Sequence, residues 1–301
     1  MISIIGSGKV GSAIAFLMAT TSLDDIVLVN RSKEKAVGTA LDISNSVSVN
    51  SPVSVVGTDD YSKIKNSEVI IISASAGNSG TSRMDLLEQN VALIKDIAKK
   101  IKQYSPESKI LIVTNPLDII TYVFQKEVPF PKEKVIGIAG NLDSSRFRYI
   151  LAKELNTEVS KITNAMVLGE HGDTMVPIFS HARYSGKPVL DFLSTTQVQQ
   201  ITDNVRNYWK DLRKYKVFSI FGIAKNTTDI ARAIIKDEKL SLSASVLLDG
   251  QYGLNDLCLG VPIKINKNGI DKIEEISLEK MELESLRYSA SVVKSYLDSM
   301  T

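Results

Sequence analysis

Short apolar runs alternate with longer segments of helical periodicity through the first half of the chain. The runs Ile26–Val29 and Val69–Ile72 are continuously apolar, which is typical of parallel strands covered on both faces, and Ile2–Ile5 is apolar apart from Ser3. Further strands are expected at 53–56, 110–113 and 135–138, and helices at 12–20, 33–46 and 84–104. This alternation predicts an α/β fold with a Rossmann-type, doubly wound parallel sheet over residues 1–139.

The pattern changes at residue 140. Helices are expected at 141–155, 198–214, 227–236 and 278–297, and strands at 246–248 and 261–265. We therefore expect a second, α+β substrate domain over residues 140–301. No linker rich in proline, glycine or serine separates the two halves, so the domains are expected to share a tight interface.

Composition narrows the classes of function. The 301 residues are 44% hydrophobic and 23% charged, with a formal net charge of +2; such a chain folds, and this charge favours neither nucleic acid nor a membrane surface as a partner. A single cysteine, Cys258, rules out an internal disulfide and a cysteine zinc cluster, and no metal is expected. Without a signal peptide or a membrane-spanning run, a cytoplasmic location is expected.

A glycine motif lies between the first predicted strand and the first predicted helix. Gly6, Gly8 and Gly11 form G-x-G-x-x-G, with Lys9 and Val10 inside it. In this context the first glycine permits a tight turn, the second lets a pyrophosphate approach the backbone, and the third lets helix and strand pack closely. The motif predicts a dinucleotide site at the helix N-terminus.

The residues after the second strand bear on the choice of cofactor. A NAD-binding fold usually has an acid there, which binds the ribose hydroxyls. This chain has Asn30 and Arg31, followed by Ser32 and Lys33. These groups suit a 2′-phosphate and hence NADP, but a neutral replacement that still binds NAD explains them equally well.

One of the two histidines, His171, lies between glycines after an apolar run. A histidine so placed is suited to proton exchange near neutral pH, although a turn with a surface histidine is the simpler interpretation. Asp143 and Arg146 are three residues apart on a predicted helix, so they share one face. Taken alone, they could also form an ordinary exposed ion pair.

Four stretches, in order, resemble the lactate/malate dehydrogenase family: IIGSGKVGSA at the start, VTNPLDIITYV from Val113, GNLDSSRFRYI from Gly140 and LGEHGDTMVP from Leu168. The resemblance covers nearly the whole chain. It implies that His171 exchanges a proton with the substrate and that Asp143 holds its imidazole. It also implies that Arg146 grips the substrate carboxylate.

The resemblance implies further contacts. Arg83, after the glycine- and serine-rich loop 75–82, would close over the substrate with that loop and polarise its carbonyl. Asn115 would contact substrate and nicotinamide, and Asn90 and Val113 would contact the cofactor. Self-association to a dimer or tetramer is also implied.

Two departures bear on the substrate. Asn78 or its neighbour falls where malate enzymes of the family carry an arginine for the second carboxylate. Within 216–219 the chain has the apolar residues Val217 and Phe218, where lactate enzymes tend to have threonine and malate enzymes a small residue. We expect an NAD(P)-dependent L-2-hydroxy acid dehydrogenase, malate dehydrogenase-like and so of the tricarboxylic acid cycle. Lactate or another apolar 2-hydroxy acid is the alternative substrate. A non-catalytic nucleotide-binding protein and an NAD- and metal-dependent glycosidase are more remote alternatives.

Overall fold

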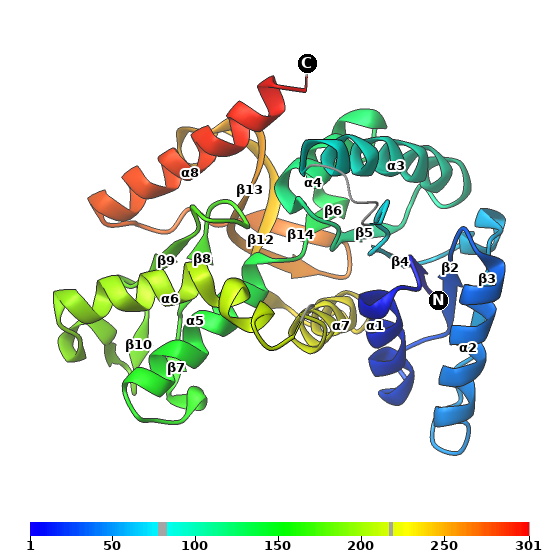
Figure 1. Ribbon diagram of the computed structural model, residues 1–301, viewed down its shortest axis with the longest axis horizontal. Coiled ribbons are helices and arrows are strands. Elements are labelled where there is room, and N and C mark those ends of the chain that lie inside the picture. Colours follow the sequence, from blue (N-terminus) through cyan, green and yellow to red (C-terminus); the bar gives the residue numbers. More distant parts are fainter. Residues whose placement is uncertain (78–82, 217–218, 301) are drawn as a thin grey trace. The chain divides into compact units, whose positions relative to one another are not determined.

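The computed structural model describes residues 1–77, 83–216 and 219–300 (Figure 1). The chain forms two compact units. The first comprises Met1–Ile138, Ile220–Leu240 and Ile265–Asp271, and the second Ala139–Ser219, Ser241–Lys264 and Lys272–Thr301. The chain first passes from the first unit to the second after Ile138, one residue before the boundary expected at 139/140. Two later segments, Ile220–Leu240 and Ile265–Asp271, belong again to the first unit.

The first unit contains a parallel sheet in the order β3-β2-β1-β4-β5-β6. Its strands are β1 (Ile2–Ile5), β2 (Ile26–Val29), β3 (Val55–Thr58), β4 (Val69–Ile72), β5 (Lys109–Ile112) and β6 (Val135–Gly137). This is the order of a doubly wound dinucleotide-binding sheet, so the predicted fold class is confirmed. The strand expected at 53–56 begins and ends two residues later than predicted.

The helices of this unit are α1 (Lys9–Thr20), α2 (Lys33–Val47), α3 (Arg83–Tyr104), α4 (Leu117–Glu127) and α7 (Phe221–Ile235). Three of them depart from the sequence prediction, the first being α1, which begins three residues before the helix expected at 12–20. α4 was not predicted, because buried residues cover most of its circumference and even Asp118 and Thr121 are buried, which obscures the amphipathic period. α7 begins six residues before the helix expected at 227–236.

The second unit is built around α5 (Gly140–Glu154), α6 (Thr195–Arg213) and α8 (Lys280–Asp298). Between them lie the antiparallel pair β8 (Met166–Leu168) and β9 (Val176–Ile178), and a small sheet of β7 (Ile162–Thr163), β10 (Arg183–Tyr184) and β11 (Lys187–Pro188). The core of the unit includes Phe147 and Phe179, whose rings meet edge to face at 4.9 Å. The five short strands were not predicted.

Three longer strands are neighbours in the order β14-β13-β12: β12 (Leu240–Asp249), β13 (Asn255–Asn266) and β14 (Gly269–Ile273). Short 3₁₀ helices are η1 (Tyr61–Ile64), η2 (Lys132–Lys134), η3 (Val159–Lys161), η4 (Val189–Phe192) and η5 (Gln251–Gly253). Within the described ranges, no helix has the length and apolarity needed to cross a membrane.

Candidate active site

The glycine motif forms the turn between β1 and α1 in the first unit. Gly6 has φ +105°, and a Cβ there would lie 2.6 Å from the backbone nitrogen of Ala74. A Cβ on Gly11 would lie 1.9 Å from the carbonyl oxygen of Gly6, whereas Gly8 faces open space. Lys9 and Val10 are the first residues of α1, whose N-terminus favours an anion. The turn therefore fits a pyrophosphate, with each glycine in the role that the motif predicts.

Asn30 links the glycine turn to the start of α2. Its Nδ2 donates to Ser7 Oγ (2.8 Å), and its Oδ1 accepts from the backbone N–H of Ser32 (3.0 Å). The side chain of Arg31 is exposed. Asn30 is thus fixed at the carboxyl end of β2, where ligands bind in sheets of this class.

A carboxylate that the sequence analysis overlooked lies beside this position. Ser32 caps α2, and its hydroxyl donates to Glu34 Oε2 (2.9 Å). The pKa of Glu34 is lowered, first by its own backbone N–H and then by the Ser32 hydroxyl. The Ser32 hydroxyl proton, which we expected to suit a 2′-phosphate, is therefore engaged by an anionic group.

Asn90 on α3 connects two chain segments at the carboxyl ends of β4 and β5. Its Nδ2 donates to the carbonyl of Asn115 (3.0 Å), and its Oδ1 accepts from Ala76 N (2.8 Å) and from Ser75 Oγ (3.3 Å). The side chain is buried, whereas Asn115 is exposed. The structure thus gives Asn90 a bracing role that the sequence did not indicate.

The remaining residues expected to contact cofactor or substrate include Val113, Arg83 and Asn78. The backbone N–H of Val113 donates to the carbonyl of Ile72 (2.9 Å), which places Val113 just past the end of β5. Arg83 is the first residue of α3, but its side chain lies outside the described part of the structure. Asn78 and the apolar pair 217–218 also lie outside the described residues.

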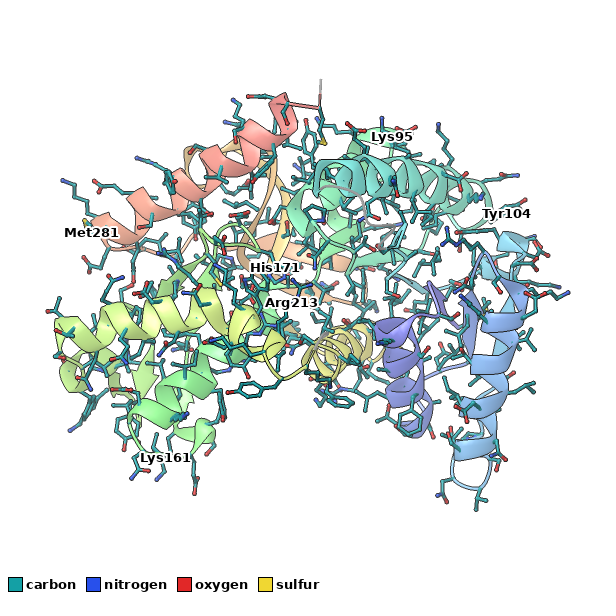
Figure 2. The ribbon with its side chains drawn as sticks, in the orientation of Figure 1. Lys95, Tyr104, Lys161, His171, Arg213 and Met281 are labelled. Carbon is teal, nitrogen blue, oxygen red and sulfur yellow. The ribbon has the colours of Figure 1, made fainter. Side chains whose placement is uncertain are left out.

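His171, labelled in Figure 2, lies in the second unit on the loop between β8 and β9. Its Nδ1 is 2.6 Å from Asp143 Oδ2, while Asp143 Oδ1 accepts from Arg146 Nη1 at 2.9 Å. Asp143 is 2% exposed and Arg146 is 8% exposed. The interpretations as a plain surface histidine and as an exposed ion pair are therefore wrong, since one buried carboxylate joins the imidazole of His171 to the guanidinium of Arg146.

The loop that carries His171 is held by residues far away in the sequence. The backbones of Gly169 and Gly260 exchange two hydrogen bonds, of 2.8 and 3.1 Å, and a Cβ on Gly260 would lie 2.6 Å from Gly169 O. The fully buried Ser289 Oγ on α8 accepts from the backbone N–H of Glu170 (2.7 Å) and lies 3.0 Å from Thr174 Oγ1. Thr174 also donates to the Glu170 carboxylate. Sequence reasoning missed Gly260 and Ser289, because no local motif marks them.

This arrangement is suited to acid-base chemistry on a carboxylate-bearing substrate. A carboxylate on Nδ1 orients an imidazole and stabilises its protonated form, and a guanidinium binds carboxylates with two parallel hydrogen bonds. Among the described residues, no group of three or more His, Cys, Asp and Glu side chains is arranged to hold a metal ion.

Comparison with known proteins agrees with this geometry. Residues 1–137 match the family described as lactate/malate dehydrogenase, NAD binding domain, and residues 140–301 match its alpha/beta C-terminal domain. The chain belongs to the lactate/malate dehydrogenase family. It is therefore an enzyme, an NAD-dependent dehydrogenase acting on the CH–OH group of a 2-hydroxy acid, which confirms the expected reaction type.

Malate dehydrogenases and lactate dehydrogenases are both similar to this chain. The chain is 41% identical to a malate dehydrogenase of Pelagibacter ubique, over 98% of this chain and 95% of that one. The structure of the malate dehydrogenase from Aeropyrum pernix matches with a TM-score of 0.94 at 32% identity, over 99% of this chain and 98% of that one. A lactate dehydrogenase from Cryptosporidium parvum, complexed with lactic acid and nicotinamide adenine dinucleotide, matches with a TM-score of 0.93 at 35% identity, over 99% and 97%.

Proposed function

We propose that this dehydrogenase interconverts malate and oxaloacetate, with His171 as the proton-exchanging group and Arg146 as the carboxylate anchor. The assignment of residues rests on the buried carboxylate of Asp143, which holds both side chains. When bound, NAD would supply the hydride acceptor. The turn at Gly6, Gly8 and Gly11 would hold its pyrophosphate.

The chemistry of each side chain follows from its contacts. Asp143 occupies Nδ1 of His171, so Nε2 is the nitrogen that takes the hydroxyl proton as hydride leaves the substrate carbon. The resulting imidazolium is stabilised by the Asp143 carboxylate. Arg146 uses Nη1 for Asp143, and its other N–H groups would bind the substrate carboxylate. Arg83 would polarise the carbonyl in the reverse direction.

His171→Asn tests the acid-base assignment. General acid-base catalysis contributes roughly 10² to 10⁴ in rate, so kcat should fall by about that factor while NADH binding changes little. A folded variant that turns over at the wild-type rate would overturn the assignment.

Arg146→Lys keeps the charge but loses the planar fork, and we expect a large loss of kcat/KM with every 2-oxo acid.

The choice of malate rests on the relative at 41% identity, which is a malate dehydrogenase. Lactate is the alternative, because Asn78 or its neighbour stands where an arginine would read a second carboxylate. A panel of oxaloacetate, pyruvate and bulkier 2-oxo acids, compared by kcat/KM with NADH, decides between them. A preference for oxaloacetate would support malate and a place in the tricarboxylic acid cycle, and a preference for pyruvate would refute both.

We also propose that the enzyme tolerates NADP. Asn30 brings no negative charge to the ribose position, and Arg31 is exposed beside it. Glu34 opposes this, because its anionic carboxylate engages Ser32. At low salt, where exposed charges are least screened, NADPH should work at least as well as NADH, and the double substitution Asn30→Asp with Arg31→Ile should restore NAD preference. Wild-type enzyme that ignores NADPH under these conditions contradicts the proposal. Glu34→Gln then shows whether Glu34 is the cause.

Self-association and a cytoplasmic location complete the proposal. On α8, Leu286 and Val293 are buried within the chain, whereas Met281 and Tyr288 are 72% and 64% exposed, and these two exposed side chains could be buried against a second subunit. We expect a dimer or tetramer in sedimentation at micromolar concentration. A single species of 33.0 kDa would contradict self-association. Cell fractionation tests the cytoplasmic location. No partner of nucleic acid or membrane is proposed.

A further inference from the structure

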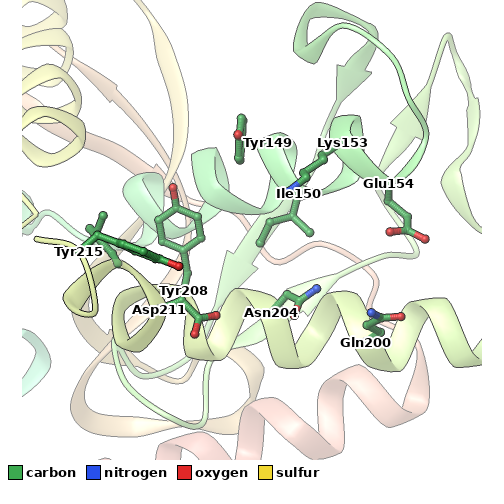
Figure 3. Close-up of a pocket in the computed structure, with 10 residues that line it drawn as sticks. Tyr149, Ile150, Lys153, Glu154, Gln200, Asn204, Tyr208, Asp211 and Tyr215 are labelled. Carbon is green, nitrogen blue, oxygen red and sulfur yellow. The ribbon is translucent and has the colours of Figure 1, made fainter.

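A groove of about 580 Å³ lies between α5 and α6 in the second unit. Its lining includes Tyr149 on α5 and Tyr208 and Tyr215 near the end of α6 (Figure 3). Tyr149 and Tyr215 are largely exposed, whereas Tyr208 is half-buried and reaches from α6 toward α5. Carboxylates also line the groove, at Glu154 and Asp211.

Tyr208 differs from the other two tyrosines because it contacts the side chain proposed as the carboxylate anchor. The Cζ atom of Arg146 lies 5.1 Å from the centroid of the Tyr208 ring, within the range of a cation–π contact. Asp143 holds one edge of the same guanidinium through the 2.9 Å bond to Nη1. Asp143 thus fixes one edge of the guanidinium, and Tyr208 covers the guanidinium with an aromatic ring.

We propose that Tyr208 is a positioning residue for substrate binding, which holds the guanidinium plane of Arg146 ready for a two-pronged bond with the substrate carboxylate. The proposal rests on the role of Arg146 given above. Two parallel hydrogen bonds require the planes of guanidinium and carboxylate to coincide. One bond to Asp143 leaves the guanidinium free to rotate about that edge, and the Tyr208 ring removes this freedom.

Tyr208 also lies as a barrier between the groove and the guanidinium of Arg146. Tyr208 lines the groove and also contacts Arg146. Replacing the ring with a smaller side chain would open the groove toward the guanidinium and free the guanidinium plane to turn away from the orientation that the substrate carboxylate needs. The loss should therefore appear in substrate binding rather than in the chemical step or in cofactor binding.

Tyr208→Leu and Tyr208→Met remove the aromatic face, and Tyr208→Phe keeps it. A partly desolvated cation–π contact is worth roughly 0.5–2 kcal/mol, so we expect Leu and Met to raise KM for the 2-oxo acid by about 2- to 30-fold. kcat and KM for NADH should stay within about twofold. Phe should restore the wild-type KM. Tyr149→Leu, which removes a groove tyrosine not implicated in holding Arg146, is the matched control and should change none of these values.

Four outcomes would overturn the inference: an unchanged KM in both the Leu and Met variants, a Phe variant as impaired as Leu, an equal rise in KM for NADH, or a comparable KM rise in Tyr149→Leu. Arg146→Lys separates this inference from the proposed function. A large loss with Arg146→Lys but none with Tyr208→Leu leaves the anchor intact and refutes the role of Tyr208. No loss with Arg146→Lys refutes the anchor itself. If both hold, Tyr208→Leu should add little to the Arg146→Lys background, because the two residues act as one unit.

Discussion

Replacing Asp143 with asparagine removes the negative charge that lies between His171 and Arg146. The new side chain has nearly the same shape, but only its oxygen accepts a hydrogen bond. If that oxygen stays on Arg146, the amide NH₂ faces His171 Nδ1. The imidazole must then keep its proton on Nε2. Oxidation of the substrate needs this nitrogen unprotonated, so that its lone pair can accept the hydroxyl proton.

The magnitude follows from the wrong imidazole tautomer and from the lost negative charge. Each hydrogen bond to a charged group contributes about 1.5–3 kcal/mol, and the corresponding change of carboxylate to amide in a serine-protease triad lowers kcat by about 10⁴ through the wrong tautomer. We expect kcat/KM for the Asp143→Asn enzyme to fall by about 10³ to 10⁴. Breaking a buried ion pair costs about 3–5 kcal/mol, because Arg146 is left buried without a countercharge. For units of this size that corresponds to a fall in Tm on the order of 6–20 °C.

Steady-state kinetics in both directions and thermal unfolding measure the two effects. Asp211→Asn is the control, since Asp211 is a 58% exposed carboxylate paired with a lysine, and it should change neither kcat/KM nor Tm appreciably. An Asp143→Asn enzyme that keeps more than about a tenth of wild-type kcat/KM would show that neither the tautomer nor the charge of this pair matters. An unchanged Tm would show that the buried pair contributes no net stability.

Three further predictions concern other parts of the chain. Ser289→Ala leaves the backbone N–H of Glu170 without its acceptor, at a cost of about 1–3 kcal/mol. kcat should fall by about tenfold or more as the His171 loop loosens, whereas Ser108→Ala, which removes another buried hydroxyl, should lower Tm but not kcat. Gly6→Ala should abolish NADH binding measured by fluorescence, since its Cβ would strike backbone at 2.6 Å and φ is +105°. Ion pairs with two lysines lower the pKa of Glu274 from 4.5. This stabilisation is present above pH 4.5 and is lost as the pH falls through the lowered pKa, so Glu274→Gln should lower Tm at pH 7 and should lower it progressively less as the pH falls below 4.5.

Much of the first unit was predictable because its signals are local. The run Val69–Ile72 predicts a covered strand by itself, and the glycines at 6, 8 and 11 lie within one turn of chain. Asp143 and Arg146 were recognisable as a pair from a spacing of three residues on one helix. Such features depend on neighbours along the chain, whose separation the sequence fixes directly.

Only the tertiary structure identified the residues that hold these groups in place. Ser289 lies 119 positions from Glu170, and Tyr208 reaches Arg146 from a different helix. Nothing in the periodicity around Ser289 distinguishes it from any other buried serine, and α4 escaped prediction because it is buried on nearly every side. Local sequence determines which element forms and which residues face inward. Which residues meet across the core depends on how the elements pack, and that is set by all of them together.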